Sequence, residues 1–207
     1  MKKVILAILI IFNVGLLFAQ KLPIEILVGH NAVNTQFIVN KKFSETSKFG
    51  VFSVINFNMP YDRQNVNYKY HIVQANIFYS LSKHISLFAG GFTNPKDYGA
   101  SLGLQARFLF KNGMFFISNR NSVLTNYASE FLVMSEFRPK LTDKLNLYSR
   151  LQVMTETDFT EAKRNFQMLR LGLGFKQYQF GLGATFDQFG NKPIKEENYG
   201  IFVRAEL

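Results

Sequence analysis

Apolar and polar residues alternate along most of the chain beyond residue 20. The clearest case is the stretch 169–187, LRLGLGFKQYQFGLGATFD, where apolar side chains fill every second position on both sides of Lys176–Gln177. A period of two is typical of β-strands whose two faces meet different surroundings. The opposite face of this hairpin mixes glycine, charge and amide. The pattern therefore favours two adjacent strands with lipid on one side and a crowded polar lumen on the other.

The same alternation, interrupted by polar turn segments, predicts about twelve strands, an even number that returns both chain ends to one side of a barrel. Short turns alternate with mostly longer polar loops, as expected if the turns lie in the periplasm and the loops outside the cell. The count depends on dividing the first long stretch at His30–Asn31; ten strands is the alternative, and eight would require longer loops. The predicted strands are 23–30, 33–42, 48–59, 68–81, 84–93, 98–110, 114–124, 128–139, 144–155, 164–175, 178–188 and 198–207.

The first residues have the composition of a secretory signal peptide. Lys2 and Lys3 precede an apolar segment that ends near Leu17, and Ala19 provides a small residue before a cleavage point. We expect residues 1–19 to be removed and residues 20–207 to form one barrel domain. An uncleaved anchor helix is the alternative, but the apolar run is short for a membrane span.

The composition of the rest of the chain supports export and a membrane-spanning sheet. The sequence has no cysteine, which excludes lipoprotein anchoring, disulfides and thiol catalysis. Beyond the signal peptide, no segment has the roughly 18 uninterrupted apolar residues of a membrane helix. The chain carries a formal charge of +10, and its 24 lysines and arginines are dispersed along the sequence. Attraction to anionic lipid and lipopolysaccharide therefore explains the excess of positive charge better than nucleic-acid binding, which would gather basic residues in a patch. We predict an all-β, closed antiparallel transmembrane β-barrel located in the outer membrane.

The final strand carries the most specific signal. Apolar residues alternate up to the last position of the sequence, at Tyr199, Ile201, Val203, Ala205 and Leu207. This resembles the C-terminal assembly signal of small Gram-negative outer-membrane β-barrel proteins, which implies recognition by the barrel-assembly machinery. That family usually ends in an aromatic residue, and Leu207 departs from this. No motif identifies a subfamily.

A lipid-modifying barrel enzyme is the main alternative function, and it would need a serine, a histidine and an acid in contact. His84 falls in a predicted periplasmic turn, whereas His30 and His71 lie near loop-side strand ends. None has the sequence context of known barrel deacylases or phospholipases. No spacing of metal ligands is present either. We therefore expect no catalytic residue, no metal and no cofactor.

Charged residues on the inward positions of the predicted strands are the remaining candidates for function. An arginine or lysine that faced lipid near the midplane would cost roughly 2–4 kcal/mol, so inward placement is favoured. These side chains would either form a lattice that plugs the lumen or line a narrow pore whose excess of arginine selects anions. The candidates are Arg107, Glu130, Glu136, Arg138, Arg150, Arg170, Asp187, Arg204 and Glu206.

Four glycines of the opening hairpin, Gly172, Gly174, Gly181 and Gly183, share the inward face. They predict the wall where an open lumen is to be expected, unless a bulky neighbour such as Tyr148 or Phe202 fills the space. The expected function is a structural barrel or a small passive channel with an anion preference, and the expected state is a monomer. A soluble periplasmic β-barrel carrier is a further alternative, disfavoured by the bulky outward rows.

Overall fold

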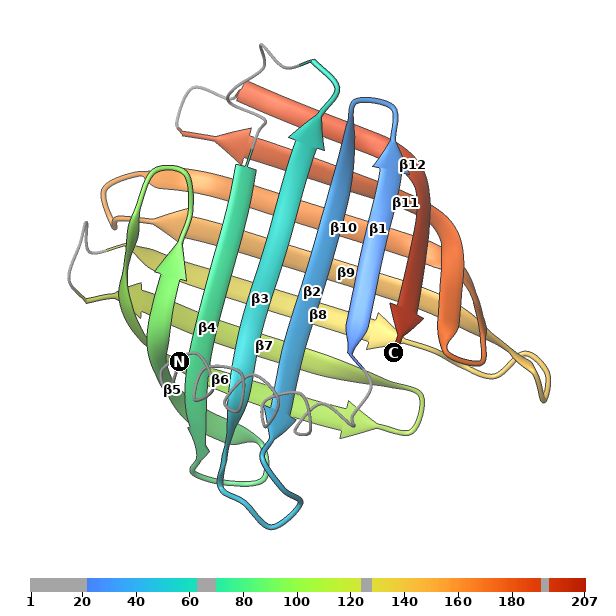
Figure 1. Ribbon diagram of the computed structural model, residues 1–207, viewed down its shortest axis with the longest axis horizontal. Coiled ribbons are helices and arrows are strands. Elements are labelled where there is room, and N and C mark those ends of the chain that lie inside the picture. Colours follow the sequence, from blue (N-terminus) through green and yellow to red (C-terminus); the bar gives the residue numbers. More distant parts are fainter. Residues whose placement is uncertain (1–21, 63–69, 124–127, 191–193) are drawn as a thin grey trace, which may run out of the picture.

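The computed structural model describes residues 22–62, 70–123, 128–190 and 194–207, which form an all-β structure of twelve strands (Figure 1). The predicted signal peptide 1–19 lies outside the described residues. The strands are β1 Pro23–Gly29, β2 Ala32–Lys42, β3 Phe49–Pro60, β4 Tyr70–Ser80, β5 Ile85–Thr93, β6 Tyr98–Phe110, β7 Gly113–Ser122, β8 Ser129–Phe137, β9 Leu145–Thr157, β10 Ala162–Phe175, β11 Tyr178–Phe189 and β12 Ile194–Glu206.

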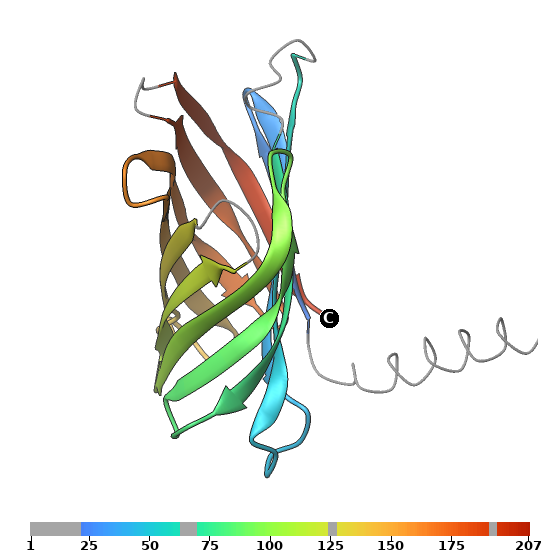
Figure 2. The same cartoon turned by 90° about the vertical axis from the view of Figure 1, so that its left-hand side faces the viewer.

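The strands close into a barrel in which each pairs with its neighbours in sequence and β12 pairs with β1. All of these pairings are antiparallel; the closing one runs from Pro23 opposite Glu206 to Gly29 opposite Gly200. The predicted closed twelve-stranded barrel is confirmed. The barrel is flattened: β1–β4 cross in front of β8–β11 in Figure 1, and Figure 2 shows the two walls from the edge.

The two ends of the barrel differ in their connections. Two-residue turns join β6 to β7 and β10 to β11 at the end that also holds Leu22 and Leu207. We call this the turn end and the opposite one the loop end. The connection between β8 and β9 at the turn end is longer than the sequence predicts. Strand β8 stops at Phe137 because Pro139, two residues later, has no N–H to donate to a neighbouring strand.

Alternation along each strand produces an apolar exterior. On β10 and β11, for example, Leu169, Leu171, Phe180 and Leu182 are exposed, whereas the residues between them face inward. Such a surface is stable only against lipid, because it would otherwise expose continuous apolar area to water. Within the described residues, no helix is long and apolar enough to cross a membrane.

Candidate functional site: the barrel lumen

Glu25 of β1 holds two arginines from the opposite wall at the turn end of the lumen. Its Oε1 accepts a hydrogen bond from Nε of Arg170 at 2.8 Å, and its Oε2 accepts one from Nη1 of Arg150 at 3.2 Å. Arg150 also donates to the side-chain oxygens of Gln36 and Gln152. All five side chains are buried. These contacts tie β1 and β2 to β9 and β10 across the flattened barrel.

Glu136 of β8 is the centre of a second network at the same end. It accepts a hydrogen bond from Arg204 at 2.6 Å, pairs with Arg138, and accepts a weaker bond from the Tyr148 hydroxyl at 3.3 Å. Arg138 and Arg204 both reach Glu206 as well, at 2.6 and 3.2 Å. Two arginines and two glutamates thus form four ion pairs, and each carboxylate is shared by both arginines.

The loop end contains two buried ion pairs of its own. Arg164 donates from Nε and Nη2 to both oxygens of Asp187, at 2.7 and 2.6 Å. Its guanidinium lies 3.6 Å from the ring centre of Tyr70, on the facing wall. Arg120 donates to Glu130 at 3.0 Å, and its guanidinium lies 4.0 Å from the ring centre of Phe92. Bidentate and cation–π contacts of this kind compensate the burial of the charge.

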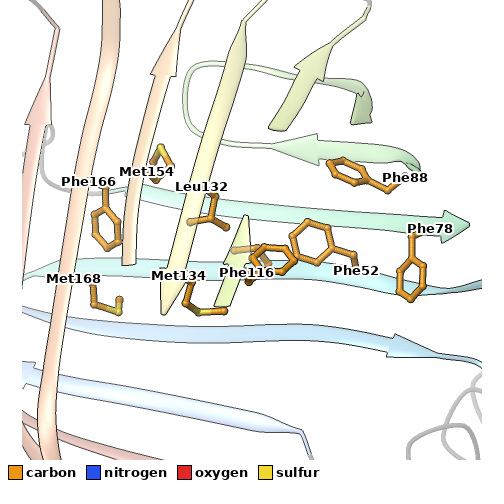
Figure 3. Close-up of a cluster of buried hydrophobic side chains, with 10 residues drawn as sticks. Phe52, Phe78, Phe88, Phe116, Leu132, Met134, Met154, Phe166 and Met168 are labelled. Carbon is orange, nitrogen blue, oxygen red and sulfur yellow. The ribbon is translucent and has the colours of Figure 1, made fainter. Parts of the chain in front are cut away.

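An apolar belt occupies the lumen between these two charged ends (Figure 3). Phe52 of β3 packs against Phe116 of β7 with ring centres 5.3 Å apart, although three strands separate β3 from β7. The belt therefore crosses the lumen rather than lining one wall. Its buried members are Phe52, Val54, Phe78, Phe88, Phe116, Leu132, Met134, Met154, Phe166 and Met168.

A cavity of about 200 Å³, which we call the basic chamber, lies between the belt and the turn end. Phe116 and Met134 form the side toward the belt. Five basic side chains line the chamber, and three acidic ones do so as well. The basic residues are Lys41, Arg107, Arg138, Arg150 and Arg204, and the acidic ones are Glu25, Glu136 and Glu206. A much smaller cavity of about 30 Å³ lies on the other side of the belt, beside Leu132, Met154 and Phe166.

The wall formed by the hairpin glycines is filled rather than open, by the two residues that the sequence analysis named as the alternative. Tyr148 on β9 lies opposite Gly172, and Phe202 on β12 lies opposite Gly181. The two rings meet over the glycines with centres 5.6 Å apart, and both side chains are fully buried together with Leu27. The other two glycines face polar side chains: a Cβ at Gly183 would lie 2.9 Å from the Arg170 side chain, and one at Gly174 would lie 2.4 Å from that of Asn146. The glycines make room for these groups.

The structure places the candidate charged residues at both ends of the lumen. Arg150, Arg170, Arg204 and Glu136 are buried at the turn end, and Glu130 and Asp187 are buried at the loop end. Arg107, Arg138 and Glu206 are only partly buried at the turn end.

Among the buried charges that sequence reasoning missed, Glu25, Arg120 and Arg164 form hydrogen bonds in these networks, and Glu156 is buried as well. Each lies on a strand where apolar residues also face inward, such as Leu27 beside Glu25 and Phe166 beside Arg164. These inward apolar residues obscure the alternation. Glu25, Arg120 and Arg164 could have been found from their spacing, because residues an even number of positions apart on a strand share a face. Arg120, for example, lies two positions after the inward Ser118.

The three histidines lie outside these networks. The ring Nδ1 of His30 accepts a hydrogen bond from the Tyr199 amide at 3.0 Å, and its ring stacks on that of Tyr199. The Nδ1 of His84 lies 3.1 Å from the Arg107 carbonyl. His71 stands beside Phe57 on the exterior. Within the described residues, no group of three histidine, cysteine or acidic side chains is arranged to hold a metal ion.

The residues of the C-terminal strand face outward. Tyr199, Ile201 and Val203 on β12, and the terminal Leu207, are exposed on the apolar exterior, with Ala205 half-buried between them. Their recognition by the assembly machinery stays a prediction.

The described fold is similar to that of solved outer-membrane porins. A KdgM porin in complex with disordered oligogalacturonate aligns over 90% of this chain and 99% of its own, with a TM-score of 0.51 and 7% identity. A NanC porin aligns over 91% of this chain and 100% of its own, with a TM-score of 0.46 and 12% identity. No protein-family model and no curated protein matches the sequence. At such identities the likeness shows the fold alone. The chain has the fold of a Gram-negative outer-membrane β-barrel, and its lipid-facing exterior places it in the outer membrane.

Proposed function

We propose that the protein is a small passive channel of the outer membrane that prefers anions and has no enzymatic activity. The observation that carries this proposal is the composition of the basic chamber, where five basic side chains lie with three acidic ones. Basic side chains around a pore select anions. A barrel of twelve strands also encloses more space than the eight-stranded barrels that side chains fill. Because short turns face the periplasm in these barrels, the chamber opens toward the periplasm.

The apolar belt is the barrier to passage in this conformation. A hydrophobic constriction closes a pore by excluding water, without any need for a tight steric block. Three of the belt residues, Met134, Met154 and Met168, are unbranched side chains with three rotatable bonds. Rearrangement of these side chains would admit water with little movement of the strands.

Conductance in planar bilayers under a salt gradient tests the proposal. The wild type is compared with a belt variant, Phe116→Ala with Met134→Ala. We expect the belt variant to conduct more than the wild type, with a reversal potential that favours chloride over potassium. Lys41→Glu in the belt variant should shift the reversal potential toward cations, whereas Lys144→Glu, in an exposed turn away from the chamber, should not.

A plugged structural barrel is the second candidate, because the belt fills the lumen from β3 to β7. Absence of conductance in both the wild type and the belt variant would support the plugged barrel. A cation preference in a conducting belt variant would contradict the role of the basic chamber.

A further inference from the structure

A second cavity opens at the turn end beside the basic chamber, and we call it the side pocket. It has a volume of about 450 Å³ and lies between β2, β4, β5 and β6. The β2–β3 and β4–β5 turns next to it are at the bottom of Figures 1 and 2. Lys41, Lys42, Lys83, His84 and Arg107 contribute to its lining. Among the described residues that line it, none is an aspartate or a glutamate, which distinguishes it from the chamber.

A polar bridge between β2 and β6 separates the side pocket from the chamber. The Nδ2 of Asn40 donates to Oε1 of Gln105 at 3.1 Å, and the backbone carbonyl of Asn40 accepts from Nη1 of Arg107 at 2.9 Å. Three strands lie between β2 and β6, so these contacts cross the corner of the flattened barrel. Asn40 and Arg107 line both cavities. Arg107 therefore forms part of the floor of the side pocket.

The position of Arg107 is fixed by its neighbours. Its backbone N–H donates to the His84 carbonyl at 2.9 Å, its own carbonyl lies 3.1 Å from Nδ1 of His84, and the His84 ring stacks on Phe108. Its guanidinium is bonded to a neutral carbonyl, whereas Arg150 and Arg204 pair with carboxylates. Arg107 is also attracted by Glu136 across the chamber, but the hydrogen bond from its guanidinium goes to a carbonyl, so its guanidinium can contact an anion at the floor of the pocket. A fixed guanidinium presents parallel donors that match a phosphate or carboxylate.

We propose that the side pocket binds a multivalent oxyanion of the phosphate type at the periplasmic mouth, with Arg107 as its innermost contact and Lys42 and Lys83 beside it. The attraction between charges grows with the product of the charges. A pocket lined by three lysines and one arginine, with no acidic side chain among its described lining residues, therefore discriminates in favour of divalent over monovalent anions. The hydroxyls of Ser80 and Ser86 on the pocket wall supply further donors. The inference goes beyond the proposed channel, because binding here requires no passage through the apolar belt.

Calorimetric titration of pyrophosphate into the full chain in phosphatidylcholine nanodiscs tests the inference. We expect saturable binding to the wild type and weaker binding of acetate. Arg107→Gln should raise the pyrophosphate Kd about tenfold, equivalent to about 1.4 kcal/mol. Lys83→Gln, an exposed turn variant that leaves the interior unchanged, should raise it about threefold, since one of four cations is lost. The matched control Lys144→Gln, at the same end but outside the pocket, should bind like the wild type.

A folded band on a heat-modifiable gel verifies that the Arg107→Gln barrel is folded. If Arg107→Gln does not fold, the Lys83→Gln variant still tests the inference. Absence of saturable binding to the wild type would overturn the inference. Equal weakening by Lys144→Gln and Lys83→Gln would also overturn it, because it would show diffuse surface attraction. Nanodiscs with added phosphatidylglycerol distinguish two sources of the same chemistry: competition with pyrophosphate indicates a lipid headgroup in the pocket, and unchanged affinity indicates a soluble anion. The reversal potential in planar bilayers tests the proposed channel independently. Absence of pyrophosphate binding would therefore overturn the pocket and leave the channel result unaffected.

Discussion

Replacement of Glu25 should destabilise the barrel strongly, because one carboxylate holds two buried arginines. Arg170 is fully buried, and the side chains of Glu25 and Arg150 are 3% and 4% exposed. Removal of one partner from a buried ion pair costs about 3–5 kcal/mol, since the remaining charge stays out of water. Here the arginines keep other acceptors: Arg170 donates to the carbonyls of Leu169 and Ala184 at 2.9 and 3.0 Å. We therefore expect Glu25→Leu to lower the free energy of unfolding by about 3 kcal/mol, at the lower end of that range.

Glu25→Gln separates the charge from the hydrogen bonds. The amide keeps one oxygen acceptor and a similar volume, so its cost should be smaller, about 1–2 kcal/mol. A total stability of about 5–15 kcal/mol makes both losses measurable. Because the chain has no tryptophan, urea unfolding in lipid vesicles is followed by far-UV circular dichroism and by the gel shift of the unfolded band.

The matched control for Glu25 is Glu197→Gln, because the Glu197 side chain is exposed and its carboxylate accepts a surface hydrogen bond from the Tyr199 hydroxyl. Its unfolding midpoint should stay near that of the wild type. Adding Arg170→Met to Glu25→Leu should recover part of the loss, since the uncompensated charge on β10 is then removed. The reasoning is refuted if Glu25→Leu unfolds at the same urea concentration as Glu197→Gln.

Three further predictions concern other parts of the barrel. Gly181→Ala should cost about 1–3 kcal/mol, because its Cβ would lie 2.2 Å from the backbone of Leu171, whereas Gly91→Ala, with its nearest atom at 3.4 Å, should be tolerated; equal urea midpoints would contradict this. Leu171→Arg, on the lipid-facing side, should cost about 2–4 kcal/mol in vesicles and much less in a detergent that lets the side chain reach water; equal losses would argue against a lipid-facing Leu171. In the loop after β9, hydrogen bonds from the Thr160 hydroxyl and from neighbouring amides hold the pKa of Asp158 well below its usual range. The contribution of the ionised Asp158 carboxylate to the free energy of unfolding should thus be fully present above about pH 3.9, the pKa in the unfolded chain. It should be lost only as pH falls through the lower pKa of the folded protein; a midpoint at or above about pH 3.9 in an NMR titration of the Asp158 carboxyl would contradict this.

The strands could be predicted from sequence because lipid imposes one constraint on every outward position. Strand 98–110, for example, was expected from its alternating leucine and aromatic residues, and β6 spans the same residues. The strand 114–124 alternates poorly because Phe115 and Phe116 are adjacent. The structure shows why: Phe115 faces lipid, whereas Phe116 belongs to the apolar belt.

The contents of the lumen could not be predicted from the same pattern. Alternation identifies the row that must be apolar, but it leaves the inward row free to be polar or apolar. Phe52 and Phe116 are equally consistent with a core or a membrane surface until the pairing of strands brings them together across the barrel. Contacts such as Glu25 with Arg170 join strands far apart in sequence, and no local signal specifies them. For the glycine wall the pattern left two alternatives open, and the structure shows the filled one, with Tyr148 and Phe202 reaching it from the flanking strands.

The division of the lumen makes binding and conduction separable. The side pocket lies on the turn-end side of the apolar belt, and the polar bridge of Asn40, Gln105 and Arg107 separates it from the chamber. Opening the belt with Phe116→Ala and Met134→Ala should therefore raise conductance and leave the pyrophosphate affinity unchanged. Arg107→Gln should change both properties, because Arg107 lines the chamber and the pocket. If the belt variant lost pyrophosphate binding, the two cavities would have to be parts of one site, and the bridge would not separate them in the membrane.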